Sequence, residues 1–500
     1  MTTASLLVRQ VRLVPVGRGM TMVPDQPVDL RIAEGVVSDV APALSATGGD
    51  EVFDADGRWA IPGLWDHHVH LTTWSRTRAT LDLAGTTGPE DVVARVRDHL
   101  AGLADPLPGL VTGFGYRSGA WNRGGTVAEL DAVTGDIPVV LTSGDAHNGW
   151  LNSAALQLLG VDEVTGPLEE NDWFGLQPAI TAELERSGSD TAALAAALAD
   201  AAARGVVGVV DLEMPTSYRQ WPSRVADGLD LIRIRASVYP DGLDDLLAAR
   251  VRTGDRLGSE LVTMGPFKVI SDGSLNTRTA RCCEPYSGTR GTQNYDLDDM
   301  VALLGRAHAG GLEIALHAIG DEAVDLALQA FEATGAVGAI EHAQLVRLED
   351  LPRMARLGVR ASVQPAHLLD DRDTTHRLWA DRADRCFALR SMIDAGVELA
   401  LGSDAPVSPL DPWLAMAAAV HRSADEREPW NPAESLTPAQ ALAASTDGQQ
   451  TIASGNVGDV VLLDANPLAP QQDSEGTGRI LRGMPVAATI VAGRVAHTQI

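Results

Sequence analysis

The 500-residue sequence predicts an α/β fold, because eight short apolar runs alternate with helical patterns between residues 61 and 452. Eight repeated β/α units are typical of a (β/α)8 or TIM barrel. Alternating strand patterns at both ends of the chain indicate a small β-sandwich domain that residues 1–60 and 453–500 build together. The first two barrel strands lie too far apart for one crossover helix, so residues from about 75 to 190 are expected to form a large insertion.

The strand signal of the composite domain comes from short runs in which apolar and polar residues alternate. SLLVRQVRLV and VDLRIAEGVVSDV lie near the start, and GDVVLLD (458–464) and AATIVAGRVAH (487–497) lie near the end. Glycine, proline and aspartate separate these runs, as expected for turns. We therefore expect both ends of the chain to pair in one small sheet beside the barrel.

The barrel strands are expected where short apolar runs end in polar residues. In order, they are 61–70, 205–212, 231–239, 266–272, 312–317, 337–342, 358–365 and 396–404. Helical periodicity fills most of the intervals, most clearly at 190–204, 296–309, 321–333 and 348–358. The insertion interrupts this order after the first strand, and we expect it to roof the mouth of the barrel.

The charge of the chain excludes several classes of partner. Acidic residues number 67 against 39 basic ones, and the net charge of -28 opposes binding to nucleic acid or to an anionic membrane. The sequence begins without a basic segment before an apolar stretch and contains no apolar run long enough to span a membrane. We expect a soluble cytoplasmic protein that acts on a small molecule, with assembly into a homo-oligomer left open.

Three cysteines, Cys282, Cys283 and Cys386, lack CxxC spacing, so we expect free thiols and no cysteine zinc site.

Ligand-type side chains stand at the ends of several expected strands. The first strand ends in Asp66-His67-His68-Val69-His70, and alternation places His68 and His70 on the same face as Asp66. The active sites of TIM barrels lie at the carboxyl ends of the strands. Further candidates at these ends are His317, His342 and Asp404.

Imidazoles combined with a carboxylate suit a divalent ion such as zinc, with manganese, iron, cobalt or nickel as alternatives. A chance pair of histidines on a polar strand would explain His68 and His70 alone, but the set of strand-end ligands favours a metal site.

Lys268 is the only lysine in the chain and lies in the fourth expected strand. A buried ammonium is costly, so the residue is either a salt-bridged core lysine or an amine with a lowered pKa. A neutral amine can add carbon dioxide to form a carbamate, which can bridge two metal ions. Guanidinium cannot replace it in that reaction, and a lone lysine in an arginine-rich chain fits this requirement.

Several motifs together resemble the amidohydrolase superfamily, and specifically amidohydrolase family 3. They are PGLWDHHVH, FKVISDGSLNTRTA, HAIGD, EHAQ, SVQPAH and GSDAPVSPLDP. The resemblance covers nearly the whole chain and implies one or two divalent ions, with a carbamate on the strand-four lysine. The metal ligands that it implies are His68, His70, Lys268, His317, His342 and Asp404.

The resemblance also implies a mechanism in which hydroxide generated at the metal attacks a carbonyl. Asp404 takes the proton and returns it to the leaving nitrogen; its alternative is a cap on the following helix. His147 is expected to bind the substrate carbonyl, or else only to stabilise its loop. Arg278 is expected either to clamp an anionic substrate or to order its loop, and His367 is expected to line the pocket.

The departure from the usual DGSLGSRTA to DGSLNTRTA puts the shape of the pocket in doubt more than the chemistry. Glu170 lies where family members often have a glutamate, with a solvated surface residue as the alternative.

The function predicted first is hydrolysis of a C–N bond in a non-peptide amide, such as an N-substituted formamide or an N-acyl compound. A lactone or ester substrate is an alternative. Ring deamination is disfavoured because Gly320 stands where deaminases of related barrels carry a glutamate. A non-catalytic binding protein is disfavoured because all six ligands are present.

Overall fold

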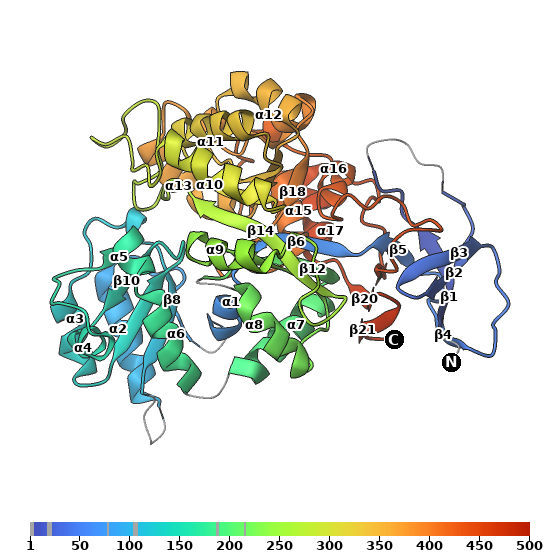
Figure 1. Cartoon of the computed structure of the whole chain (residues 1–500), viewed down its shortest axis with the longest axis horizontal. Coiled ribbons are helices and arrows are strands. Elements are labelled where there is room, and N and C mark those ends of the chain that lie inside the picture. The colour runs from blue at the N-terminus through green and yellow to red at the C-terminus, as the bar shows by residue number, and fades with distance from the viewer. Residues whose placement is uncertain (1–4, 18–22, 78–79, 104–108, 187–189, 215–216) are drawn as a thin grey trace.

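Eight parallel strands form the central sheet of the protein, shown in a computed structural model (Figure 1). The structure describes the chain except residues 1–4, 18–22, 78–79, 104–108, 187–189 and 215–216. Neighbouring strands of this sheet follow one another in chain order. They are β6 (Leu64–Val69), β12 (Val206–Asp211), β13 (Arg233–Val238), β14 (Val262–Ile270), β15 (Ile314–Ala318), β16 (Gly338–His342), β17 (Arg360–Val363) and β18 (Leu399–Leu401).

The first and last strands of this sheet meet, which nearly closes it into a barrel. The backbone N–H of Asp404 donates to the carbonyl of His68 at 2.7 Å, and that of His70 donates to Ala405 at 2.8 Å. The side chain of Asp66 adds to this seam by accepting the backbone N–H of Ser403 at 2.9 Å. The prediction of a TIM barrel is therefore confirmed.

Strand β14 begins earlier than the sequence predicts, at Val262 in place of Pro266. Its first residues pair with β13, and the register shifts between the pairs Ala236–Met264 and Val238–Phe267. Pro266 lies in this irregularity, where the ladder needs no N–H donor. Proline therefore marks a bulge within the strand and not its start.

Helices cover the outside of the barrel. The alanine-rich run predicted as a helix forms α7 (Asp190–Ala203). The others are α1 (Leu71–Thr77), α8 (Ser217–Ala226), α9 (Pro240–Ala249), α10 (Leu297–Ala309), α11 (Asp321–Thr334), α12 (Leu351–Leu357), α13 (His367–Leu378), α14 (Leu389–Asp394), α15 (Pro412–His421), α16 (Pro438–Ala443) and α17 (Ser474–Arg482). Among the described residues, no helix is long and apolar enough to cross a membrane.

Strands from both ends of the chain form one sheet beside the barrel, on the side opposite the insertion (Figure 1). Strand β1 pairs with β2 and β4 along its first part and with β5 at its end, and a register shift separates the two parts. From the other terminus, β19 pairs with β5. The strands are β1 (Ser5–Leu13), β2 (Val28–Ala33), β3 (Val36–Ala41), β4 (Asp50–Asp54), β5 (Trp59–Pro62), β19 (Val460–Leu463), β20 (Val486–Val491) and β21 (Arg494–Thr498).

The insertion after β6 has a five-stranded sheet of its own, with strands β7, β8 and β9 parallel and β9, β10 and β11 antiparallel. These strands are β7 (Leu81–Asp82), β8 (Val111–Tyr116), β9 (Val139–Ser143), β10 (Asn148–Leu151) and β11 (Leu168–Glu169). Its helices are α2 (Pro89–Ala101), α3 (Val127–Thr134), α4 (Ser153–Leu159), α5 (Glu170–Phe174) and α6 (Gln177–Arg186). The insertion therefore has an apolar core of its own, separate from that of the barrel.

Gly63 lies where the chain passes from the terminal sheet into the barrel, and the space around it leaves no room for a side chain. A Cβ atom there would stand 2.2 Å from Cγ2 of the buried Val207. We expect Gly63→Ala to lower the free energy of unfolding by about 1–3 kcal/mol, because overpacking forces the buried valine to move. Thermal unfolding followed by circular dichroism measures this loss.

Gly48→Ala is the matched control, because a Cβ atom at Gly48 meets nothing within 4 Å. Equal melting temperatures for the two variants would contradict this account of the junction.

Candidate metal centre

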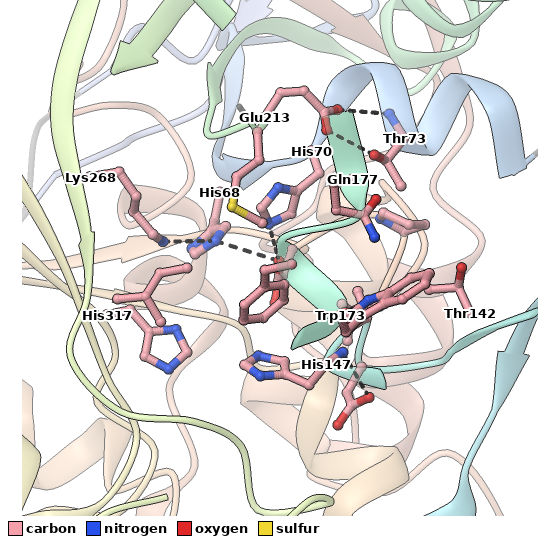
Figure 2. A pocket seen from close by; sticks show the side chains of 18 of the residues that line it. His68, His70, Thr73, Thr142, His147, Trp173, Gln177, Glu213, Lys268 and His317 are labelled. Carbon is pink, nitrogen blue, oxygen red and sulfur yellow. Dashed lines mark hydrogen bonds and ion pairs between the residues drawn. The ribbon is translucent and has the colours of Figure 1, made fainter. Parts of the chain in front are cut away.

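A cavity of about 90 Å³ opens at the carboxyl ends of the barrel strands (Figure 2). Barrel residues form its floor, and residues of the insertion, including Trp173 and Thr142, line another wall. All six side chains that the sequence analysis named as metal ligands line this one cavity, together with His147. The six are His68, His70, Lys268, His317, His342 and Asp404.

The carboxylate of Asp404 lies among the side chains of the first strand. Its Oδ1 atom is 3.3 Å from Nε2 of His70 and 3.5 Å from Nε2 of His68. The Nζ atom of Lys268 lies 3.3 Å from the same nitrogen of His68. The seam between β6 and β18 fixes the strand ends that carry His68, His70 and Asp404, and β14 brings Lys268 to them from across the barrel.

His317 and His342 lie on the other side of the cavity, with ring centroids 4.6 Å apart. Ligand atoms of His342, His68 and Asp404 all lie within 4.8 Å of one another, close enough to share one ion. Among the described residues, Nδ1 of His342 is buried and makes no hydrogen bond, whereas Nε2 of His317 lies 3.4 Å from Oδ1 of Asp272. A buried polar atom without a partner is costly, and a metal ion would satisfy the one on His342. The donor set therefore fits a divalent ion.

Burial keeps most of these imidazoles neutral. It lowers the pKa of His342 to about 3 and holds the pKa values of His68 and His317 well below the ordinary value of histidine. Burial alone would raise the pKa of Asp404, but its electrostatic interaction with His68 and the hydrogen bond from His70 outweigh burial and hold the pKa well below its usual range. Neutral imidazoles and an ionised carboxylate are the forms that bind metals.

Two of these residues have strained backbones. His342 has a φ of 71° and Asp404 a φ of 57°, both in the left-handed region that favours glycine. Such conformations cost free energy and persist where the surrounding structure requires them, often at functional sites. Asp404 is also not the helix cap that the sequence left as an alternative, because Asp411 caps α15 by accepting the N–H groups of Trp413 and Leu414.

Lys268 is almost fully buried in β14, and burial lowers the pKa of its amine. Within the described part of the chain, no carboxylate lies within 4.0 Å of its Nζ atom, so the salt-bridged alternative finds no partner. A buried amine with a lowered pKa spends more time in the neutral form that reacts with carbon dioxide. This chemistry is consistent with a carbamate.

The sequence analysis missed Glu341, which supports the His68 ring from the side away from the cavity. Its Oε2 atom accepts a hydrogen bond from Nδ1 of His68 at 2.7 Å, so the Nε2 atom of His68 is directed at the cavity. Burial raises the pKa of Glu341 to about 7, and the charge of Lys268 opposes this rise. The signal was present in the sequence, because GAIEH places a carboxylate in an otherwise apolar strand.

Glu213 was also missed, although it follows the second barrel strand. It lines the cavity and accepts hydrogen bonds from the backbone N–H and the hydroxyl of Thr73, at 2.7 and 2.8 Å (Figure 2). Asp66, by contrast, does not reach the cavity, because its carboxylate accepts the backbone N–H groups of His68 and Ser403.

Of the remaining candidates, two histidines lie at the site and Arg278 does not. His147 reaches the cavity, where its ring centroid lies 5.8 Å from that of His317. Nε2 of His367 lies 3.8 Å from Oδ2 of Asp404. Burial would lower the pKa of His147, but the carboxylate of Glu170 outweighs it and raises the pKa to about 9. Arg278 is exposed and lines neither this cavity nor the smaller one beside it, so the structure does not bring its guanidinium to the cluster.

A barrel that gathers histidines, a buried lysine and an aspartate at its mouth defines a metal-dependent hydrolase of the TIM-barrel type. The chain belongs to the amidohydrolase family, whose sequence profile matches residues 51–497.

Two relatives and one solved structure illustrate the similarity. The putative amidohydrolase YtcJ of Bacillus subtilis is 27% identical over 89% of this chain and 90% of its own length. N-substituted formamide deformylase of Arthrobacter pascens is 27% identical over 89% of each chain. An uncharacterised metal-dependent hydrolase from Pyrococcus horikoshii is 26% identical, with a TM-score of 0.76 over 93% of this chain and 99% of its own.

Removal of the lysine tests how metal is held. We expect chelator-free wild-type protein to contain about two divalent ions per chain and Lys268→Ala to contain fewer, because the variant cannot form a bridging carbamate. Elemental analysis of both proteins measures this difference. Met214→Ala, which alters the same cavity without removing a ligand, should keep the full content. Equal metal content in wild type and Lys268→Ala would make the lysine structural.

Glu341→Gln tests the support of His68. We expect the affinity for metal to fall about 10- to 100-fold, because an amide holds the imidazole less firmly than a carboxylate does. Competition with a chromogenic chelator gives the dissociation constants. Glu313→Gln, which changes an exposed carboxylate before β15, serves as the control. Unchanged affinity in Glu341→Gln would show that this hydrogen bond does not support metal binding.

Proposed function

We propose that the protein hydrolyses a C–N bond of a non-peptide amide, such as an N-substituted formamide or an N-acyl compound. The observation that carries the proposal is the single cavity lined by all six ligand-type side chains and His147. The similarity to a relative named for the removal of formyl groups from N-substituted formamides supports the choice of substrate class. A small-molecule substrate also agrees with the volume of the cavity, about 90 Å³.

The metal would be held by His68, His70, Lys268, His317, His342 and Asp404, as one or two ions with zinc as the best fit. When bound, a divalent ion lowers the pKa of water and polarises a carbonyl oxygen. Lys268 would contribute as a carbamate, since its neutral amine is the one group in this set that can acquire a carboxylate.

Two side chains would handle the substrate. Asp404 takes a proton from the attacking water and returns it to the leaving nitrogen; its Oδ2 atom is the freer oxygen, because Oδ1 faces His68 and His70. His147 enters the cavity from the insertion, opposite the barrel ligands, and binds the carbonyl oxygen of the substrate. Arg278 has no part in this proposal because it is exposed.

The walls of the cavity favour a substrate with an apolar group. Trp173, Phe174, Met214, Tyr239 and Ile270 line it beside the polar cluster. An N-alkyl or N-aryl substituent would pack against these side chains while the amide lies at the cluster.

Ring deamination is disfavoured by the space at Gly320. A Cβ atom there would stand 2.0 Å from the backbone oxygen of Arg281, so a proton-transferring glutamate does not fit at this position. Ester or lactone hydrolysis uses the same groups as amide hydrolysis, and only an assay separates the two reactions.

The assay for the proposal measures release of primary amine from a panel of N-substituted formamides and N-acyl amines by zinc-loaded protein. We expect turnover by the wild type, and we expect Asp404→Asn to lower kcat about 10²- to 10⁴-fold, because the variant has no general base.

Asp411→Asn is the matched control from the same loop, because asparagine caps a helix as well as aspartate does. It should retain full activity. Release of acid from esters or lactones without any release of amine would replace the proposed function by its alternative, and full activity of Asp404→Asn would remove the aspartate from the mechanism.

A further inference from the structure

The insertion is fastened to the barrel beside the metal centre by a segment that we call the docking loop, Ser274–Thr279, which follows β14. The Oδ2 atom of Asp145 accepts a hydrogen bond from the hydroxyl of Ser274 at 2.9 Å. The Oε1 atom of Glu170 accepts hydrogen bonds from Thr277 and Thr279 at 2.7 and 2.6 Å. Two carboxylates of the insertion are therefore held by three hydroxyls of one barrel loop.

Glu170 binds on both sides. While its Oε1 atom is held by the docking loop, its Oε2 atom lies 3.0 Å from Nδ1 of His147. One carboxylate thus connects a loop of the barrel to an imidazole that lines the cavity. Both side chains are largely buried, so Glu170 is not the solvated surface residue that the sequence left as an alternative.

The backbone at Glu170 and the glycine beside it hold the Glu170 carboxylate in position. Glu170 has a φ of 47°, in the left-handed region that non-glycine residues rarely adopt. Gly273 has no side chain, and a Cβ atom there would stand 2.8 Å from Oε1 of Glu170 and 2.0 Å from Oγ1 of Thr279. A strained glutamate and a glycine that makes room for it are the expected signs of a position held for function.

The hydrogen bond leaves His147 one free ring nitrogen. With Nδ1 bound to Glu170, only Nε2 remains to face the cavity, where the ring lies next to that of His317 (Figure 2). The ring of Phe174 packs edge-on against His147 at 5.3 Å and limits its rotation. The orientation of the imidazole is therefore set from two sides.

We propose that Glu170 is a positioning residue that acts through His147, and that the docking loop holds Glu170 in place for this purpose. This inference rests on the proposed function, because it assigns the pair to alignment of the substrate carbonyl. A glutamate that only fastens the insertion to the barrel would make the same contacts with Thr277 and Thr279. The two roles differ in one respect. Loss of a merely fastening glutamate would lower kcat by the same factor whether or not His147 is present.

A double-mutant cycle separates the two roles. His147→Ala is expected to lower kcat about 10²- to 10³-fold, as for loss of a carbonyl-binding donor. Glu170→Ala is expected to lower kcat about 10- to 100-fold with little change in KM, as for loss of the partner that orients a functional histidine. The double variant should be no slower than His147→Ala alone. Equal losses from Glu170→Ala in both backgrounds would overturn the proposal.

Glu169→Gln is the matched control, because this neighbouring carboxylate is exposed. It should leave both kcat and KM unchanged. If Glu170→Ala fails to fold, the isosteric Glu170→Gln takes its place in the cycle with the same expected pattern.

Crystal structures of the wild type, Glu170→Ala and Glu169→Gln test the inference independently of any activity. We expect the His147 ring to turn or lose its order in Glu170→Ala alone, while the metal ligands keep their positions. An unmoved ring in Glu170→Ala would overturn the proposal. If the wild type releases no amine from any substrate, the proposed function fails, and the ring position still decides whether Glu170 positions His147.

Discussion

The seam between the first and last barrel strands is the constraint on which the site depends. Asp404 and His70 donate backbone hydrogen bonds across it, and Asp66 adds a side-chain contact to Ser403. These contacts bring the carboxylate of Asp404 to within 3.5 Å of His68 and His70, although the residues belong to opposite ends of the barrel sequence. An open sheet with the same strands would leave these ligands at two separate edges.

The cavity then combines side chains from two layers of the fold. The barrel contributes the buried cluster, and its low-dielectric surroundings keep the imidazoles neutral. The insertion contributes His147 and part of the apolar wall, Trp173 and Phe174. Three hydroxyls of the docking loop hold the insertion in register with the barrel. Changes in the insertion therefore act on the chemistry as well as on the shape of the pocket.

The fold and the positions of the ligand-type residues could be predicted because they follow from local patterns. Alternation along a strand places His68 and His70 on one face, and counting apolar runs places Lys268 on the fourth strand, which is β14 in the structure. The alternation and each single apolar run can be recognised within a few residues. The carboxyl end of a barrel strand then brings each group to the same mouth.

The contacts that support these residues could not be predicted in the same way. Glu170 and Thr279 are 109 residues apart, and nothing in either segment specifies the other. Arg278 sits between Thr277 and Thr279, yet its side chain is exposed while both threonines point to Glu170. That difference depends on the turn of the loop, with Arg278 itself at a φ of 61°, and a single sequence carries no signal for it.

The seam has a consequence for biosynthesis. Asp66 and Ser403, which it joins, are separated by 337 residues, and Val16 and Thr451, which are hydrogen-bonded to each other, by 435. A ribosome delivers the amino-terminal histidines long before the aspartate that completes their cluster. Until residues 404 and 460–463 have been made, the nascent chain therefore carries these histidines without the Asp404 carboxylate and β5 without its β19 neighbour, so the complete set of six ligand-type side chains forms only late in synthesis.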